Sequence, residues 1–123
     1  MTAKILVVDD ESVTRRVVTY TLQAINVEVI CAVDGMSALE LAEDTHFDLA
    51  LIDINLPDIS GFDLLKSLRG MRSMQGVPMV IFTARNNPDD QMQAQELGAS
   101  GFLYKPFSTQ ELRDLVQQHL EHL

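Results

Sequence analysis

Asp48-Leu49-Ala50-Leu51-Ile52-Asp53-Ile54-Asn55-Leu56-Pro57 is a short apolar run that ends at a carboxylate. No polar side chain interrupts it from Leu49 to Ile52, which is typical of a strand buried on both faces, as in a parallel sheet. Pro57 and the turn residues after it stop the run, so Asp53 is predicted at the carboxyl end of its strand. Because open α/β sheets bind ligands at that end, we expect a functional site around Asp53.

Four other apolar segments also suit strands, and a segment suited to a helix follows each of the five. Ser60 and Ser108 each precede an acidic residue by three positions, which predicts a capped helix start at both places. The helix opened by Asn86-Asn87-Pro88 has the weakest apolar face of the set. The predicted strands are residues 4–8, 27–32, 49–52, 77–82 and 101–104, and the helices begin near residues 12, 37, 60, 88 and 108.

Three local predictions concern a turn, a loop and the face of one helix. A turn is expected at Asp34-Gly35, and a loop from Gly70 to Gly76. The first helix should be amphipathic, with charged and polar residues opposite its apolar face. That apolar face is predicted to contain Val13, Val17, Leu22 and Ile25.

Alternating strands and helices predict the architecture. Each strand and helix pair implies a βαβ unit with a right-handed crossover, so the strands should form a parallel sheet covered by helices on both faces. The predicted fold class is therefore a doubly wound, five-stranded α/β domain. A length of 123 residues, 46% of them hydrophobic, fits one domain that spans residues 1–123.

The charge and composition exclude several classes of partner. The formal net charge is −9, from 9 basic and 18 acidic residues, so direct binding to nucleic acid is not expected. No apolar run approaches the ~20 residues that a membrane span needs, and the amino terminus does not resemble a secretory signal. A cytoplasmic protein is predicted. The single cysteine, Cys31, is interpreted as a small core residue rather than a nucleophile.

Acidic residues follow two of the predicted strands. Asp9 and Asp10 end the first strand as Asp53 ends the third. If these strands are neighbours, each like-charged pair at roughly 4 Å would cost on the order of 4 kcal/mol at an effective dielectric of about 20. A cation must balance them, and the two candidates are a divalent metal and Lys105, which follows the fifth strand. Hard carboxylate oxygens favour Mg²⁺ over zinc.

Asp53 is the candidate nucleophile. Aspartate can accept a phosphoryl group covalently when a metal and a lysine neutralise the transferred oxygens. Thr83 also lies at a predicted strand end, and its hydroxyl can donate a hydrogen bond to the same phosphoryl group. Taken alone, each of these residues is more often a turn, cap or surface residue. Together, Asp9-Asp10, Asp53, Thr83 and Lys105 lie at the ends of four different strands on the ligand-binding side, which favours a common function.

The sequence resembles the receiver domains of the two-component response-regulator family from Lys4 to the last helix. Four motifs in this order carry the resemblance: Val7-Val8-Asp9-Asp10-Glu11, Leu51-Ile52-Asp53-Ile54-Asn55-Leu56-Pro57 with Gly61 beyond, Phe82-Thr83-Ala84, and Gly98-Ala99-Ser100-Gly101-Phe102-Leu103-Tyr104-Lys105-Pro106-Phe107. The resemblance implies a flavodoxin-like (CheY-like) strand order of 2-1-3-4-5. It also implies a cis peptide bond between Lys105 and Pro106.

The same resemblance implies how the site works. Asp53 would accept a phosphoryl group from a phosphohistidine of a sensor kinase or a phosphotransfer protein. Mg²⁺, for which Mn²⁺ can substitute, would be bound directly by Asp10 and Asp53. The other implied contacts are Asp9 to the metal through water, the Asn55 backbone carbonyl to the metal, and Lys105 and the Ala84 backbone to the phosphoryl group. Such a domain catalyses its own phosphorylation and dephosphorylation without being a conventional multiple-turnover enzyme.

The resemblance further implies a conformational switch. Thr83 would move toward the phosphoryl group and vacate space for Phe102, which reshapes the face made by the fourth helix, fifth strand and fifth helix. That face would control an output domain or a separate partner, or a phosphorylation-dependent homodimer. Asn55 and Arg85 flank the phosphoryl group and would tune its lifetime. Arg85 is expected to leave the attacking water without a carboxylate or amide to orient it.

Three other functions remain open from the residues. A small phosphatase with an aspartate nucleophile would need a second acid two residues after it, where this chain has Asn55. A flavodoxin would need a phosphate-binding loop after the first strand, where Asp9, Asp10 and Glu11 would repel a phosphate. A docking module that is never phosphorylated, a pseudo-receiver, would not need the complete set of site residues.

Overall fold

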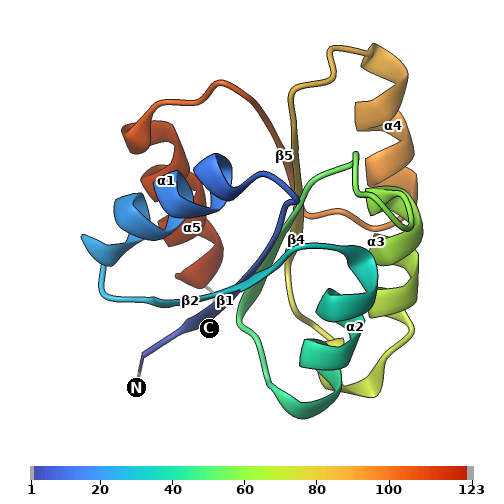
Figure 1. Ribbon diagram of the computed structural model, residues 1–123, viewed down its shortest axis with the longest axis horizontal. Coiled ribbons are helices and arrows are strands. Elements are labelled where there is room, and N and C mark those ends of the chain that lie inside the picture. The colour runs from blue at the N-terminus through green and yellow to red at the C-terminus, as the bar shows by residue number, and fades with distance from the viewer. Residues whose placement is uncertain (1, 122–123) are drawn as a thin grey trace.

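The structure is a computed structural model that describes residues 2–121. Within that range, five strands form one parallel sheet in the order β2-β1-β3-β4-β5 (Figure 1). The predicted doubly wound fold and strand order are therefore confirmed. The strands are β1 (Lys4–Val8), β2 (Glu28–Ala32), β3 (Leu49–Ile52), β4 (Met79–Thr83) and β5 (Gly101–Tyr104).

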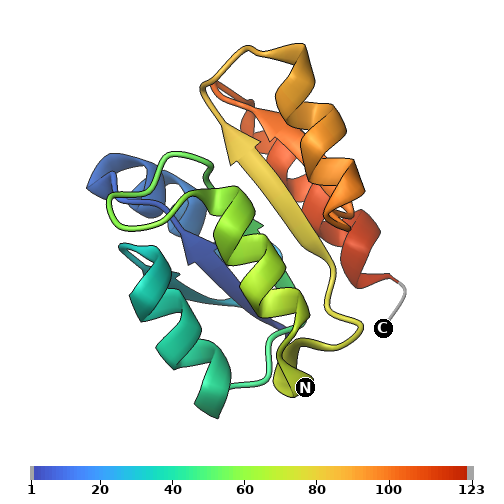
Figure 2. The same ribbon diagram turned by 90° about the vertical axis from the view of Figure 1, so that its right-hand side faces the viewer.

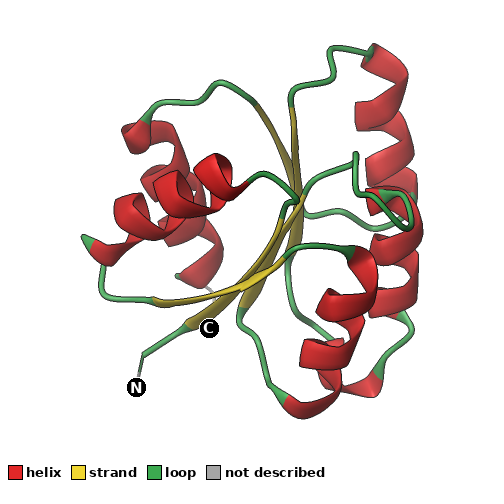
Figure 3. Cartoon of the chain, viewed as in Figure 1, coloured by secondary structure: helices red, strands yellow, loops and turns green. Residues whose placement is uncertain are grey.

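Helices cover both faces of the sheet, as Figures 1 and 3 show. One face packs against α1 (Ser12–Gln23) and α5 (Thr109–Leu120). The other face packs against α2 (Gly35–Asp44), α3 (Gly61–Arg69) and α4 (Pro88–Glu96), which face the viewer in Figure 2. None of the described helices is long and apolar enough to cross a membrane.

The sheet divides the hydrophobic core into two layers because successive side chains of a strand point to opposite faces. Ile5 and Val7 of β1 belong to the layer under α1 and α5, whereas Leu6 and Val8 belong to the layer under the other three helices. The central strands β1, β3 and β4 are almost entirely buried, which explains their uninterrupted apolar sequences. The strand that ends just before Asp53 is thus buried at the centre of the sheet.

The prediction that Cys31 is a core residue is wrong: Cys31 is exposed. Its strand, β2, forms one edge of the sheet, so its side chains are covered less completely than those of the central strands. Residues that follow each other in a β-branched run can therefore differ in burial. The Cys31 sulfur lies 3.7 Å from the Thr19 hydroxyl oxygen of α1.

The predicted apolar face of α1 is also partly wrong. Val18, Thr21 and Leu22 are the residues that α1 buries, while Val13 and Val17 are 63% and 46% exposed. Val17 is rotated by about 100° from Val18 around the helix axis, toward a side of α1 that is covered at Thr21 but not at Val13 or Val17. Val18 therefore packs against the sheet, and Val13 and Val17 lie on the surface.

Capping side chains define most helix starts. Ser60 accepts a hydrogen bond from the Asp63 amide, and Ser108 and Glu111 form the reciprocal capping box that the spacing predicted. The predicted turn at Asp34-Gly35 proves to be the start of α2, because the Asp34 carboxylate caps the Ser37 amide at 2.8 Å. The predicted loop of residues 70–76 contains a short 3-10 helix, η1 (Arg72–Met74).

Helix α4 is the least embedded of the five helices described in residues 2–121. The Asn87 side chain caps it and Pro88 begins it, as the sequence indicates. Asp90 and Ala94 are its buried residues, so its contact with the core is small. The predicted weak apolar face is confirmed.

Candidate functional site

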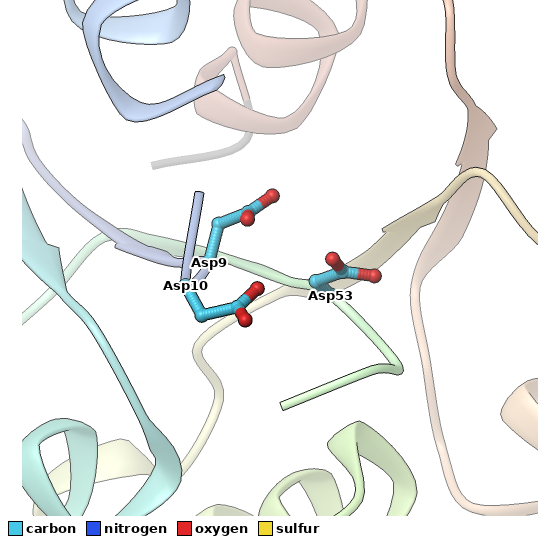
Figure 4. Close-up of side chains that lie close together, drawn as sticks. All are labelled: Asp9, Asp10 and Asp53. Atoms are coloured by element: carbon cyan, nitrogen blue, oxygen red, sulfur yellow. The ribbon is translucent and has the colours of Figure 1, made fainter. Parts of the chain in front are cut away.

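Three carboxylates meet at the carboxyl ends of two neighbouring strands. Asp9 and Asp10 follow β1, and Asp53 follows β3, which pairs with β1 in register from Ile5 and Leu49 onward. One oxygen from each carboxylate lies within 4.8 Å of the other two, and Figure 4 shows the three side chains close together. Asp9 and Asp53 are buried while Asp10 is exposed. The convergence expected from the sequence is therefore present.

Lys105 connects two of these carboxylates. Its Nζ donates hydrogen bonds to Asp9 Oδ2 at 2.6 Å and to Asp53 Oδ2 at 3.1 Å. The Lys105 side chain is only 11% exposed, and its Nζ lies 4.8 Å above the centre of the Phe82 ring. The bond between Lys105 and Pro106 is cis, as the resemblance implied. Lys105 comes from the loop after β5, so a distant part of the chain completes the site.

Burial and charge act in opposite directions on these groups. Burial raises the pKa of Asp53, and the charge and hydrogen bond of Lys105 only partly offset this effect. Burial tends to lower the pKa of Lys105, but hydrogen bonds to Asp9 and Asp53 and their charges outweigh it, so that pKa is raised. The contacts with Asp9 and Asp53 therefore favour the charged form of Lys105, whereas burial disfavours the ionised form of Asp53.

Backbone contacts hold the carboxylates in position. The amide of Asp53 donates to the Val8 carbonyl at 3.0 Å. Asp9 Oδ1 accepts from the Glu11 amide at 2.9 Å, so both Asp9 oxygens have donors within the chain. Gly61 starts α3 directly behind Asp53, where a Cβ atom would overlap the Asp53 carbonyl oxygen. Glycine is therefore required at position 61 for helix α3 to approach the site this closely.

The donor set suits a small, hard cation. The three carboxylates carry three negative charges, and Lys105 supplies one positive charge, so negative charge remains in excess. The three possible ligand atoms are all carboxylate oxygens, which Mg²⁺ prefers over the nitrogen and sulfur donors typical of zinc sites. The residues present thus fit the cation that the sequence predicts.

The remaining predicted residues lie around this cluster. Thr83 is the last residue of β4 and is fully buried, and its hydroxyl oxygen accepts a hydrogen bond from the Arg85 amide at 3.2 Å. Ala84 follows on the surface. Asn55 is exposed, and its backbone N–H donates to Asp53 Oδ1 at 3.4 Å. The roles of these residues stay predictions.

Phe102 occupies the predicted position on β5, two strands away from β3. It is half-buried and packs against the core layer under α2, α3 and α4. Its ring also contacts the Tyr104 ring, with centroids 5.0 Å apart. It lies on β5 beside the strand that ends at Thr83, since Ile81 pairs with Phe102 in the sheet.

Sequence reasoning missed two contributors. The Arg15 guanidinium of α1 donates to the Asp9 backbone carbonyl at 2.7 Å, and Asp90 of α4 pairs with Arg85. Neither contact has a sequence signature, because an arginine on a helix surface and an acid in a first helical turn both have ordinary explanations. Only the folded arrangement distinguishes them.

Comparison with known proteins identifies the family. The profile described as "Response regulator receiver domain" matches residues 5–117. The alkaline phosphatase synthesis transcriptional regulatory protein PhoP of Bacillus subtilis is 38% identical over 117 residues, which cover 95% of this chain and 48% of PhoP. The chain spans about half the length of several curated relatives that it matches.

Solved structures agree with this assignment. Chemotaxis protein CheY4 of Vibrio cholerae is 34% identical with a TM-score of 0.92, covering 98% of this chain and 100% of that chain. The receiver domain of sensor histidine kinase PA1611 from Pseudomonas aeruginosa PAO1, solved with a magnesium ion in its active site cleft, is 27% identical with a TM-score of 0.89, covering 98% of this chain and 99% of that chain. This chain therefore belongs to the response regulator receiver domain family of two-component signalling proteins.

Proposed function

We propose that residues 1–123 form one receiver domain whose Asp53 accepts a phosphoryl group from a phosphohistidine, in the cytoplasm. The donor is a sensor histidine kinase or a histidine phosphotransfer protein, in keeping with the partners of the family. The observation that carries this proposal is the contact of one half-buried lysine with two buried carboxylates, at 2.6 Å and 3.1 Å, beside a third carboxylate. An inert docking module would have no need to hold these charges together.

In the proposed reaction, one Asp53 carboxylate oxygen attacks phosphorus while the bond from phosphorus to the histidine nitrogen breaks. The histidine leaves with the electron pair of that bond. Lys105 pairs with the phosphoryl oxygens and neutralises part of their charge. The Thr83 hydroxyl donates a hydrogen bond to one of these oxygens, and the Ala84 backbone contacts the same phosphoryl group. Each step uses a group that lies at or next to the carboxyl end of a strand.

A bound Mg²⁺ supplies further positive charge to the phosphoryl oxygens. Asp10 and Asp53 would hold this ion directly and the Asn55 carbonyl would complete the protein ligands, with Mn²⁺ as a substitute ion. Asp9 already accepts hydrogen bonds on both oxygens, which supports the predicted contact of Asp9 through water. The exposed position of Asp10 supports its role as the ligand at the entrance.

The test of the proposed function is direct phosphorylation by a small donor. Incubation with acetyl phosphate and Mg²⁺ should add the mass of one phosphoryl group to the intact protein, as measured by mass spectrometry. Chelation of the metal should prevent the adduct. Repeated hydrolysis of a phosphate ester without a lasting adduct would instead favour a phosphatase.

The lifetime of the phosphoryl group should depend on residue 85. Replacing Arg85 with glutamine provides an amide that can orient the attacking water, so we expect the adduct to decay severalfold faster. The measurement is loss of the adduct over time after removal of the donor. An Arg85→Gln protein that decays at the unmodified rate would contradict this role.

The surface next to the site suits the phosphohistidine donor. A groove of about 340 Å³ is lined by Val13, Thr14, Val17, Ala84, Lys105, Pro106 and Phe107. It joins Lys105 of the site to the exposed apolar residues of α1, so it lies beside the position where a donor presents its histidine to Asp53. Single exposed apolar residues are common on protein surfaces, whereas a continuous apolar groove often marks a binding site. Because this groove lies at the entrance to the site, we assign it to the donor.

A charge in this groove should separate the two kinds of donor. In Val17→Asp, transfer from a cognate phosphohistidine protein should fall at least tenfold, because a buried unpaired carboxylate opposes docking. Labelling by acetyl phosphate should remain unchanged. The matched control is Val33→Asp, an equally exposed valine after β2, outside this groove. Equal losses from both donors would indicate damage to the site rather than to docking.

The output is proposed to pass through α4, β5 and α5. Movement of Thr83 toward the phosphoryl group would let Phe102 turn inward, and the shallow contact of α4 with the core supports a change at this face. Exposed Met92 and Tyr104 on α4 and β5 offer apolar contacts to an output domain, a separate partner or a second copy of the chain.

A further inference from the structure

An ion pair anchors the beginning of helix α4. Arg85 Nη2 donates a hydrogen bond to Asp90 Oδ1 at 3.0 Å. Arg85 Nε also lies 3.0 Å from Asp90 Oδ2, so the two groups form an ion pair, although Oδ2 accepts no hydrogen bond from the described residues. Asp90 is buried, while residues 84–89 between it and Thr83 are all exposed. The pair is therefore a side-chain attachment of an otherwise surface-exposed loop.

The same arginine also contacts Thr83. The Arg85 amide donates to the Thr83 hydroxyl oxygen at 3.2 Å, so Arg85 links Thr83 on one side to α4 on the other. Movement of this hydroxyl oxygen toward a group on Asp53 breaks that hydrogen bond if the Arg85 backbone stays in place. A backbone that follows the hydroxyl oxygen keeps this hydrogen bond, so movement of Thr83 favours movement of Arg85. The ion pair between Asp90 and the Arg85 guanidinium opposes that movement.

The pair has a large share in fixing the start of α4. Asp90 and Ala94 are the residues that α4 buries, and Asp90 lies in its first turn. A helix with so little buried apolar surface depends strongly on each remaining attachment. Loss of the ion pair with Arg85 should thus increase the mobility of both the loop of residues 84–89 and the first turn of α4.

We propose that Asp90 is a positioning residue of the phosphoryl site, which acts through Arg85 to hold Thr83 and α4 in the arrangement that lacks a phosphoryl group. This inference rests on the proposed phosphorylation of Asp53. Asp90 touches no reacting atom. Its effect is on the balance between two arrangements of the loop, and loss of its charge shifts that balance toward the phosphorylated arrangement.

The test compares Asp90→Asn with Asp89→Asn, which removes the same charge from an exposed neighbour in the same helical turn. The probe is beryllium fluoride with Mg²⁺, which imitates a phosphoryl group on aspartate. We expect Asp90→Asn to bind it about fivefold more tightly than the unmodified chain, at the lower end of typical coupling between sites. Asp89→Asn should bind it with unchanged affinity. Unchanged or weaker binding by Asp90→Asn would overturn the proposal.

Two further measurements separate this role from a general loss of stability. Arg85→Gln should tighten binding by the same factor as Asp90→Asn, and the double variant should gain no more, because both changes break one pair. Additive gains would overturn the proposal. In the ligand-free protein, the Arg85 amide should exchange its hydrogen faster in Asp90→Asn but not in Asp89→Asn; equal exchange in both variants would also overturn it.

Failure of the proposed function has a different signature. If the unmodified chain does not bind beryllium fluoride, the phosphorylation proposal fails, and amide exchange in the ligand-free protein still decides whether Asp90 holds the loop. If the unmodified chain binds the probe and the two aspartate variants behave alike, only the role of Asp90 is lost.

Discussion

Asp53→Asn is expected to eliminate the phosphate adduct completely. Asparagine has nearly the same shape but lacks the nucleophilic carboxylate oxygen, so no covalent bond to phosphorus can form. The measurement is the intact mass after incubation with acetyl phosphate and Mg²⁺. The matched control is Asp48→Asn, which changes an acid just before the amino end of the same strand and should leave labelling intact. Labelling that survives in Asp53→Asn would place the acceptor elsewhere.

The same variant should be folded and more resistant to denaturant than the unmodified protein at neutral pH. Burial raises the pKa of Asp53, so the folded state binds a proton there more readily than the unfolded chain does. The pKa of Asp53 is 3.8 in the unfolded chain and higher in the folded protein. Ionisation of Asp53 consequently lowers the stability of the folded protein as the pH rises through this range. Asparagine removes this loss. The gain in the unfolding midpoint should disappear in acid, where Asp53 itself is protonated, and a gain that persists there would contradict this electrostatic cause.

Lys105→Met is expected to have the largest effect on stability in metal-free buffer. It leaves the buried carboxylates of Asp9 and Asp53 without their cation, and breaking such a pair typically costs about 3 kcal/mol or more. Methionine preserves most of the aliphatic length, so the loss reports charge rather than packing. Chemical denaturation with a chelator present measures it. The control Lys66→Met alters an exposed lysine on α3 and should change stability little.

Magnesium should restore part of the stability lost in Lys105→Met. A divalent ion bound to the folded carboxylates adds positive charge and stabilises only the folded state, so the denaturation midpoint should rise with Mg²⁺ concentration. The increase should exceed that of the unmodified protein, where Lys105 already balances part of the charge. Labelling by acetyl phosphate should still fall sharply, because Mg²⁺ does not replace the lysine at the phosphoryl oxygens. A variant as stable as the unmodified protein without metal would refute the structural role of Lys105.

Local sequence patterns predicted much of the fold because they act over short distances. The apolar run before Asp53 identifies a central strand, since only a strand buried on both faces lacks polar positions. The spacing of Ser108 and Glu111 specifies a helix start that needs no tertiary contact. The gathering of Asp9, Asp53 and Lys105 was also predictable, because parallel strands bring their carboxyl ends to one edge of the sheet.

Predictions failed where burial depends on neighbours that a pattern does not contain. Val13 and Val17 match a helical apolar stripe, but α1 meets the sheet through Val18 and leaves them exposed. Cys31 lies in a strand-like run, but its strand is at the edge of the sheet. The rotation of a helix about its axis and the coverage of an edge strand are properties of the assembled core, so the sequence around each residue does not specify them.

The sequence by itself determined the elements, their order and the residues that end each strand, because hydrogen-bonding periodicity and capping are local. Only the tertiary structure decided the individual contacts: that Lys105 donates to both Asp9 and Asp53, that an apolar groove opens beside them, and that Arg85 pairs with Asp90. Such contacts join residues far apart in the chain or on opposite sides of a turn. Their distances follow from packing of the whole core, which no short segment encodes.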